Sequence, residues 1–259
     1  MSLKSIIKWI LLRIWYWYVS KTDKNAEILF MNYGYHNINQ QIAIDEYNEK
    51  NRFSIQLYHH LASEVEIKNK EIVEIGCGRG GGLSYIANKF SPHSAIGIDV
   101  CRKAISFCNN YYSGEKKLLF LRGNAQKILL ENNSCDIVIN VESSHRYNNM
   151  KAFLQEVYRI LRSGGYFLFT DFRCSNKINE IKMLLKMCNF EILKEKFINN
   201  EIVTALQMDD QRKRTLIKKL SPKLLQKIAF NFAALIGSDT YNKFISNQFV
   251  YFSYVLKKT

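Results

Sequence analysis

Proline and glycine are scarce in this chain of 259 residues, which contains 2 Pro and 12 Gly. That scarcity excludes a collagen-like or low-complexity chain, and 47% hydrophobic residues supply enough apolar material for a folded core. The six cysteines lie far apart and form no Cys-x-x-Cys pair. Neither a zinc site nor a disulfide framework is indicated, so we expect no metal and a cytoplasmic protein with reduced thiols.

A charge-free apolar run long enough to cross a bilayer is missing from residues 1–20. Lys4, Lys8 and Arg13 interrupt this segment, whereas a membrane-spanning helix needs about 20 mostly apolar residues. The aromatic run at 15–18 provides neither the apolar core nor the cleavage site of a signal peptide. Two interpretations stay open for the segment: a helix at a membrane surface, or a helix that packs over the active site.

Acidic residues are outnumbered, with 23 Asp and Glu against 37 Lys and Arg, a net charge of +14. Residues 151–259 hold 19 basic and 9 acidic residues and therefore carry +10 of that charge. Seven basic residues lie in the segment 211–228, which has no acid. An excess of this kind favours anionic partners. The segment is interpreted either as a solvated helix face or as a contact with lipid headgroups.

Short β-branched runs alternate with helical patterns from residue 71 onwards, which is typical of βαβ units. The predicted strands are 71–75, 95–99, 118–122, 136–141, 165–171, 190–197 and 249–256. The predicted helices are 81–90, 101–111, 149–161 and 178–188. We predict an α/β fold with a doubly wound, mostly parallel sheet and an antiparallel last strand. An N-terminal helical cover (1–65) is expected to precede a domain (66–259) that carries a helical cap at about 200–245.

A glycine-rich turn follows the first predicted strand, where residues 74–82 read Glu-Ile-Gly-Cys-Gly-Arg-Gly-Gly-Gly. Glycine is needed where the chain turns sharply and a ligand approaches the backbone. Asp99 ends the next strand, 23 residues after Gly76, where a carboxylate can accept hydrogen bonds from both hydroxyls of a ribose. The same spacing of glycines also fits a site that binds a dinucleotide cofactor. However, Glu74 adds a negative charge beside the turn, which suits a ligand with an ammonium group, such as S-adenosylmethionine, better than a pyrophosphate.

These residues resemble the class I S-adenosylmethionine-dependent methyltransferases, whose first motif is an acidic residue followed by Gly-x-Gly-x-Gly. Glu74, Gly76, Gly78 and Gly80 match this motif, and Asp99 matches the acid at the end of the second strand. The resemblance implies a Rossmann-like sheet of seven strands that binds S-adenosyl-L-methionine and releases S-adenosyl-L-homocysteine. It also implies cofactor contacts at Cys77, Val100, Asn124, Ala125 and Val141. Asn124 stands where the family commonly has Asp, so the hydrogen bond to the adenine amino group would use its side-chain oxygen.

A narrower resemblance links residues 31–35, 141–147 and 237–254 to small-molecule O-methyltransferases, including phthiotriolone-type lipid enzymes and related polyketide enzymes. It implies a hydrophobic, lipid- or polyketide-like acceptor. Tyr33 and Tyr35 flank a glycine, which would allow aromatic faces to close near a sulfonium group. Ordinary packing explains these two tyrosines equally well.

A histidine follows the fourth predicted strand at the edge where ligands of α/β sheets bind. The ordinary pKa of a histidine side chain, near 6.5, suits His145 to act as a general base that removes the proton of an acceptor hydroxyl. Glu142 is interpreted as orienting His145 or binding cofactor, and a histidine that only shapes the pocket is the alternative. Phosphoethanolamine N-methylation is the second interpretation of the activity. A nucleic-acid base methyltransferase is disfavoured because residues 140–143 lack prolines, and a cofactor-binding protein without catalysis is the non-enzymatic alternative.

Overall fold

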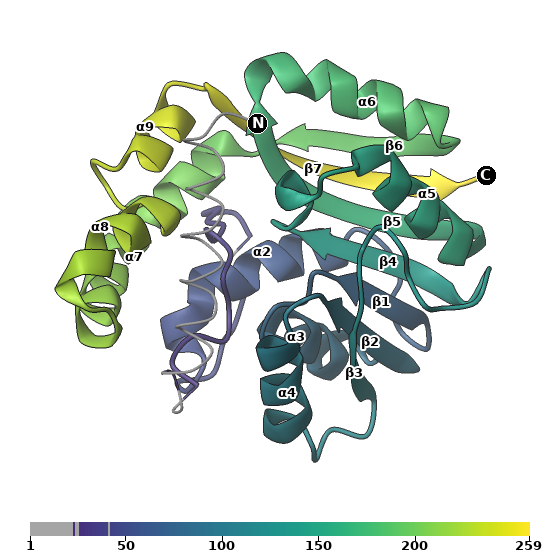
Figure 1. Cartoon of the computed structure of the whole chain (residues 1–259), viewed down its shortest axis with the longest axis horizontal. Coiled ribbons are helices and arrows are strands. Elements are labelled where there is room, and N and C mark those ends of the chain that lie inside the picture. Colours follow the sequence, from purple (N-terminus) through teal and green to yellow (C-terminus); the bar gives the residue numbers. More distant parts are fainter. Residues whose placement is uncertain (1–22, 24–25, 41) are drawn as a thin grey trace.

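The central sheet follows the alternating pattern of the sequence in the computed structural model, which describes residues 23, 26–40 and 42–259 (Figure 1). The strands lie in the order β3-β2-β1-β4-β5-β7-β6. β1 to β5 pair in parallel, and β7 runs antiparallel between β5 and β6. The strands are β1 (Glu71–Ile75), β2 (Ser94–Asp99), β3 (Leu118–Arg122), β4 (Cys135–Val141), β5 (Leu161–Cys174), β6 (Phe190–Phe197) and β7 (Phe249–Lys258). The seven-stranded, mostly parallel sheet is thereby confirmed.

Helices cover both faces of this sheet and form two hydrophobic cores (Figure 1). On one face, Phe153 and Val157 of α5 and Leu185 of α6 are fully buried. On the other, Leu57 of α2 and Leu83 of α3 are equally buried. The helices are η1 (Glu49–Asn51), α2 (Arg52–Ala62), α3 (Gly81–Phe90), α4 (Arg102–Tyr111), η2 (Ser144–Arg146), α5 (Met150–Ile160), η3 (Ser175–Lys177), α6 (Ile178–Met187), α7 (Asn199–Leu220), α8 (Lys223–Phe232) and α9 (Asp239–Ile245).

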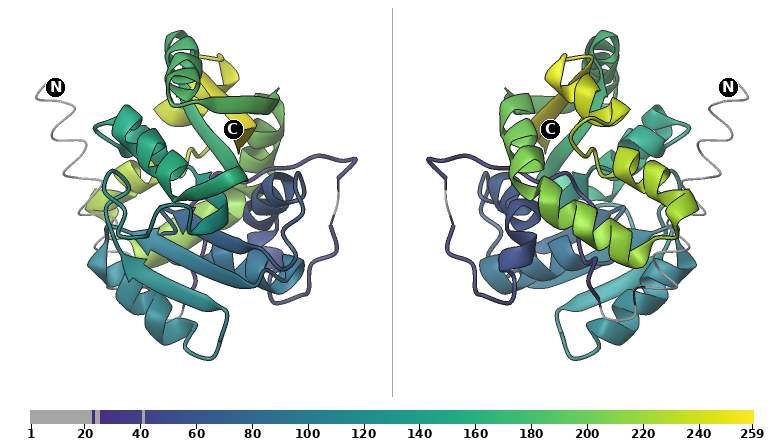
Figure 2. Two further views of the ribbon diagram at one scale, coloured as in Figure 1. Left: turned by 90° about the vertical axis from the view of Figure 1, so that its right-hand side faces the viewer. Right: turned by 90° about the vertical axis from the view of Figure 1, so that its left-hand side faces the viewer.

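Helices α7, α8 and α9 connect β6 to β7 and lie together at one side of the sheet (Figures 1 and 2). The basic segment 211–228 is divided between α7 and α8, because Pro222 cannot continue the first helix. Arg212 and Arg214 form ion pairs with Asp209 and Asp210 one turn earlier. Part of the positive charge of this segment is therefore neutralised within α7.

Strand β5 is longer than the predicted strand 165–171. It runs to Cys174 because β7 pairs with it as far as Cys174 and Phe249. It also begins earlier, at Leu161, and includes Gly164, which has a φ of +76°. Residues 1–20, for which the sequence predicts a helix, lie outside the described residues. Among the described residues, none of the helices combines the length and apolar character needed to cross a bilayer.

Candidate active site

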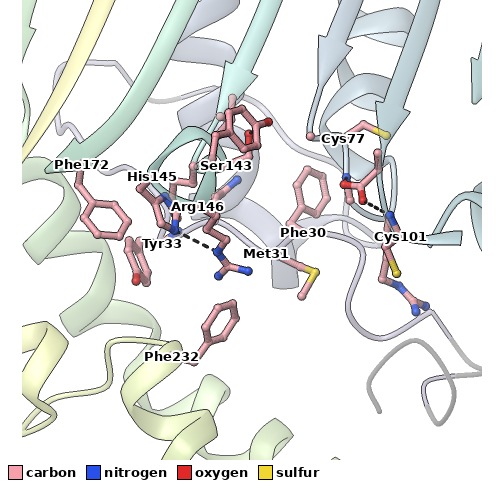
Figure 3. Close-up of a pocket in the computed structure, with 18 of the residues that line it drawn as sticks. Phe30, Met31, Tyr33, Cys77, Cys101, Ser143, His145, Arg146, Phe172 and Phe232 are labelled. Carbon is pink, nitrogen blue, oxygen red and sulfur yellow. Dashed lines mark hydrogen bonds between the residues drawn. The ribbon is translucent and has the colours of Figure 1, made fainter. Parts of the chain in front are cut away.

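A large cavity opens at the carboxyl ends of the parallel strands, bounded by residues 29–33 and by the cap helices (Figure 3). Its volume of about 2170 Å³ exceeds the roughly 300–1,000 Å³ of ordinary ligand pockets. The structure brings the following predicted site residues to its wall: Tyr33, Gly76, Cys77, Gly78, Asp99, Val100, Asn124, Ala125, Val141, Glu142 and His145. Glu74 and Gly80 lie behind this wall. The cavity has room for a nucleoside-sized molecule together with a long acceptor.

The glycine loop between β1 and α3 presents its backbone to the cavity. Gly76 has a φ of +80°, and a Cβ there would lie 2.3 Å from the Ser143 Oγ. Gly78 has a φ of +53°, and a Cβ there would have no neighbour within 4 Å, so its open side is available to a ligand. Gly80 caps α3 with a φ of +78° and packs against Phe120. Gly80 therefore shapes the turn, whereas Gly78 provides the open surface.

Two acidic residues, Glu74 and Asp99, lie next to this loop. Burial raises the pKa of Glu74 to about 7. Its Oε1 accepts a hydrogen bond of 2.7 Å from the Tyr58 hydroxyl, while its buried Oε2 lacks a hydrogen-bond partner among the described residues. Asp99 accepts hydrogen bonds from the amides of Gly78 (3.0 Å) and Cys101 (2.8 Å). Burial also raises the pKa of Asp99, so a cationic ligand would stabilise the ionised form of both groups.

The cavity wall beyond Asp99 is partly apolar. The Val100 side chain is 68% exposed there, which leaves a surface for a flat ring. Asn124 Oδ1 accepts a hydrogen bond of 3.0 Å from the Gln126 amide, so the oxygen expected to meet an adenine amino group already has a partner. Burial raises the pKa of the Cys77 thiol well above its ordinary value. Cys77 therefore serves as an uncharged part of the wall and is no nucleophile.

His145, in η2 after β4, is held by a carboxylate that the sequence analysis did not assign. Its Nδ1 lies 2.8 Å from Asp171 Oδ1, and its backbone amide donates to Asp171 Oδ2 at 3.0 Å. With Asp171 as the acceptor, Nδ1 carries the proton and Nε2 has the lone pair. Burial lowers the pKa of His145, although Asp171 opposes the shift. A neutral imidazole at neutral pH follows.

Asp171 itself is completely buried in β5. Burial acts to raise its pKa, yet His145 and Arg173 hold this pKa well below its ordinary range. Arg173 Nη1 lies 3.2 Å from Asp171 Oδ2, and the Ser144 hydroxyl donates to the same oxygen at 2.6 Å. The carboxylate therefore stays ionised and fixes the orientation of the imidazole.

The hydrogen-bond partners of Glu142 are Tyr33 and Tyr251, and not His145 as the sequence suggested. Its Oε1 accepts hydrogen bonds from the Tyr251 hydroxyl (2.5 Å) and from the Tyr33 amide (2.8 Å). On the other side of the same residue, Lys213 Nζ of α7 donates to the Tyr33 carbonyl at 3.0 Å. We call these four residues the Tyr33 clamp. It fixes residues 31–35 between β4 and the cap, and burial raises the pKa of Glu142 to about 8.

A second contact ties the start of the described chain to the glycine loop. Arg79, only 2% exposed, lies in the loop and forms an ion pair of 3.1 Å with Asp23, which is 3% exposed. The Asp23 carboxylate also accepts hydrogen bonds from the amides of Glu27 and Ile28. The guanidinium stacks 3.7 Å above the centre of the Phe107 ring. Asp23, Glu27 and Ile28 are therefore held beside the predicted cofactor site.

The comparisons with known proteins agree with this architecture. Residues 73–169 match the family model described as "Methyltransferase domain". A fatty-acid O-methyltransferase from Mycolicibacterium smegmatis is 37% identical over 82% of this chain and 77% of its own length. The phthiotriol/phenolphthiotriol dimycocerosates methyltransferase of Mycobacterium leprae is 33% identical over 88% of this chain and 85% of its own length.

Solved structures agree in fold at low sequence identity. A geranyl diphosphate C-methyltransferase from Streptomyces coelicolor A3(2) superposes with a TM-score of 0.67 at 14% identity, covering 91% of this chain and 90% of that one. The chain belongs to the S-adenosylmethionine-dependent methyltransferases, in the group that includes these fatty-acid and phthiotriol enzymes. It is therefore an enzyme that uses S-adenosylmethionine as the methyl donor.

Proposed function

We propose that this enzyme transfers the methyl group to a hydroxyl of a hydrophobic, lipid-like small molecule, with His145 as the proton acceptor. The observation that carries the proposal is the pairing of His145 Nδ1 with the buried Asp171, which leaves Nε2 as the lone-pair nitrogen at the cavity wall. The two curated relatives are named for a fatty acid and for phthiotriol dimycocerosates, which supports a lipid acceptor.

The residues at the glycine loop fit S-adenosylmethionine. Glu74 lies fully buried behind the glycine loop, and its Oε2 lacks a donor among the described residues; its carboxylate would favour an ammonium group on the cavity side of the loop. Gly78 leaves open space where a Cβ would otherwise project. Asp99 would accept from ribose hydroxyls with its remaining lone pairs, and Val100, Ala125 and Val141 would line the adenine end. When bound, the cofactor supplies a methyl group on a positively charged sulfur.

The acceptor end lies between His145 and the cap. Phe172 packs against the His145 ring with centroids 4.5 Å apart. Phe232 lines the cavity near Arg146, and Phe30 and Met31 line it between His145 and the glycine loop (Figure 3). These apolar side chains would bind an alkyl chain and exclude water from the reacting oxygen. A lipid-like acceptor is consistent with this lining.

Proton transfer would follow from the geometry of the imidazole. In the structure Arg146 Nε donates a hydrogen bond of 3.1 Å to His145 Nε2. An acceptor hydroxyl that takes the place of Arg146 at Nε2 can deliver its proton there as its oxygen attacks the methyl carbon. Asp171 would stabilise the imidazolium that forms and keep the ring oriented, because its own pKa is too low for it to take the proton. Glu142, engaged in the Tyr33 clamp, would act as a positioning residue.

We further propose that residues 1–65 serve as a cover and about 200–245 as a cap on the domain 66–259. The Tyr33 clamp and the ion pair between Asp23 and Arg79 support this division. Contact with an anionic membrane through 1–20 and 211–228 is proposed for a cytoplasmic enzyme with lipid substrates. It is supported by Lys218, Lys223 and Lys227, which are exposed, whereas the more N-terminal arginines of 211–228 pair within α7.

The test is transfer of a labelled methyl group to lipid extracts by wild-type protein and by His145→Ala. We expect a labelled hydroxylated lipid, a rate reduced by about 10²–10⁴-fold in the variant, and unchanged cofactor binding by calorimetry. His93→Ala, at an exposed position, is the matched control. An unchanged rate in His145→Ala would reject the proposed base, and a labelled phosphoethanolamine derivative would reject the acceptor.

A further inference from the structure

The nitrogen of His145 that would take the proton already has a partner in the protein. Arg146 Nε donates a hydrogen bond of 3.1 Å to His145 Nε2, while Asp171 holds Nδ1. Figure 3 shows the Arg146 guanidinium directed into the cavity, between His145 and Phe232. The guanidinium carbon lies 5.2 Å from the centre of the Phe232 ring. In this arrangement the lone pair of Nε2 is not available to a molecule that enters the cavity.

Water competes with the acceptor for the methyl group of the donor. A water oxygen next to a free Nε2 of His145 could form the bond to the methyl carbon, while one water proton passes to Nε2. The carbon–sulfur bond would break with its electron pair staying on sulfur, and the products would be methanol, a neutral thioether and the imidazolium. This side reaction consumes the donor without methylating a lipid. Keeping the base from water until the acceptor is bound prevents it.

We propose that Arg146 blocks Nε2 of His145 until a lipid acceptor displaces it, and that it thereby directs methyl transfer to the lipid and away from water. The proposal rests on the proposed function, because it takes His145 as the base. A lipid hydroxyl can displace the guanidinium because burial of the alkyl chain against Phe172 and Phe232 contributes binding free energy. A water molecule lacks this contribution. Arg146 therefore determines specificity, whereas His145 takes part in the reaction.

The fold allows Arg146 to leave Nε2 without a change in the backbone. The amides of His145 and Arg146 donate to Asp171 Oδ2 and to the Ser143 carbonyl at 3.0 and 3.1 Å, so the turn of η2 is fixed. The Arg146 side chain is only half-buried and lines a large cavity, into which it can rotate. A hydrogen bond from a charged donor keeps its partner occupied by about tenfold or more. The apparent affinity for an acceptor is lowered by the same factor.

The first experiment measures the availability of the lone pair without donor or acceptor. Diethyl pyrocarbonate modifies an unprotonated imidazole nitrogen, and mass spectrometry gives the rate at each histidine. We expect His145 to react about tenfold faster in Arg146→Met than in wild-type protein. His93, which is exposed, is the internal reference and should react equally fast in both proteins. Equal rates at His145 would overturn the block.

The second experiment measures turnover of S-adenosylmethionine with no acceptor present. We expect Arg146→Met to form S-adenosylhomocysteine and methanol several-fold faster than the wild type, with donor binding by calorimetry unchanged. The double variant Arg146→Met/His145→Ala should return to the wild-type rate. Lys151→Met, at an exposed position outside the cavity wall, is the matched control and should not change the rate. No increase in Arg146→Met, or an increase that persists without His145, would overturn the proposal.

The third experiment adds 1-dodecanol as the acceptor. Because the alcohol no longer has to displace a side chain, KM should fall about tenfold in Arg146→Met, while kcat changes little. A lower kcat with KM unchanged would overturn the proposal. Failure of the wild type to methylate any hydroxylated lipid would reject the proposed function, and the modification rates at His145 would then still decide whether Arg146 blocks Nε2.

Discussion

Replacing Glu142 by glutamine should stabilise the protein at alkaline pH. The buried side chain of Glu142 has a pKa of about 8 against an ordinary value of 4.5. Between these two values the folded protein keeps a proton that the unfolded chain has lost, so stability falls as the pH rises through this window. The amide introduced by Glu142→Gln would keep an oxygen that accepts from Tyr33 and Tyr251 without acquiring a charge.

The magnitude follows from the two pKa values. Each pKa unit corresponds to about 1.4 kcal/mol, so ionising Glu142 at pH 9 costs the folded state at most about 5 kcal/mol. Lys213 lies nearby and favours the charged form, and buried groups relax when they ionise. We therefore expect a gain of about 1–3 kcal/mol for Glu142→Gln at pH 9 and about zero at pH 5, or several degrees in the unfolding temperature for a domain of this size.

The assay is thermal and urea unfolding of wild-type protein and Glu142→Gln at several pH values from 5 to 9. Glu115→Gln, at an exposed position, is the control and should shift neither curve. Glu142→Ala removes the two hydrogen bonds that Glu142 accepts in the Tyr33 clamp and should destabilise the protein at every pH. A stability difference between wild type and Glu142→Gln that does not change with pH would refute the reasoning.

Two other substitutions test the cofactor site and its cover. Gly78→Ala would place a methyl group in the open space beside the loop, so we expect the affinity for S-adenosylmethionine, measured by calorimetry, to fall about tenfold or more. The free energy of unfolding should fall by only about 1 kcal/mol, because φ is positive at this residue. Unchanged affinity would show that the ligand does not approach Gly78. Asp23→Asn leaves the buried Arg79 without its counter-charge and should cost about 3–5 kcal/mol in urea unfolding. The double variant with Arg79→Met should recover part of this loss, and a strictly additive result would contradict a direct pairing.

The sequence predicts the fold well because its signals are local. The strands and the glycine turn depend on neighbouring residues, and six of the seven predicted strands agree with the structure to within two residues at either end. The placement of Gly78 and Asp99 beside one another also follows, since parallel strands end at the same edge of a sheet.

The contacts of the site were harder to predict because they join distant parts of the chain. Glu142 and Tyr33 are 109 residues apart, and Arg79 and Asp23 are 56 apart. Asp171 could have been found, because it was predicted to end the strand beside the one that precedes His145. Glu142 has a φ of +45°, a conformation that glutamate rarely adopts, so the sequence does not predict it. With this backbone conformation the Glu142 carboxylate lies at Tyr33 and not at His145.

The position of β7 has a consequence for how the chain is made. β6 is synthesised before β7, yet its neighbour in the sheet is β7, which also pairs with β5 along nine residue pairs. Until β7 has emerged from the ribosome, β5 therefore has one unpaired edge and β6 has no strand to pair with. A nascent chain stalled before Phe249 would expose the edge of β5 together with an unpaired β6, and such intermediates are the ones that molecular chaperones protect from aggregation.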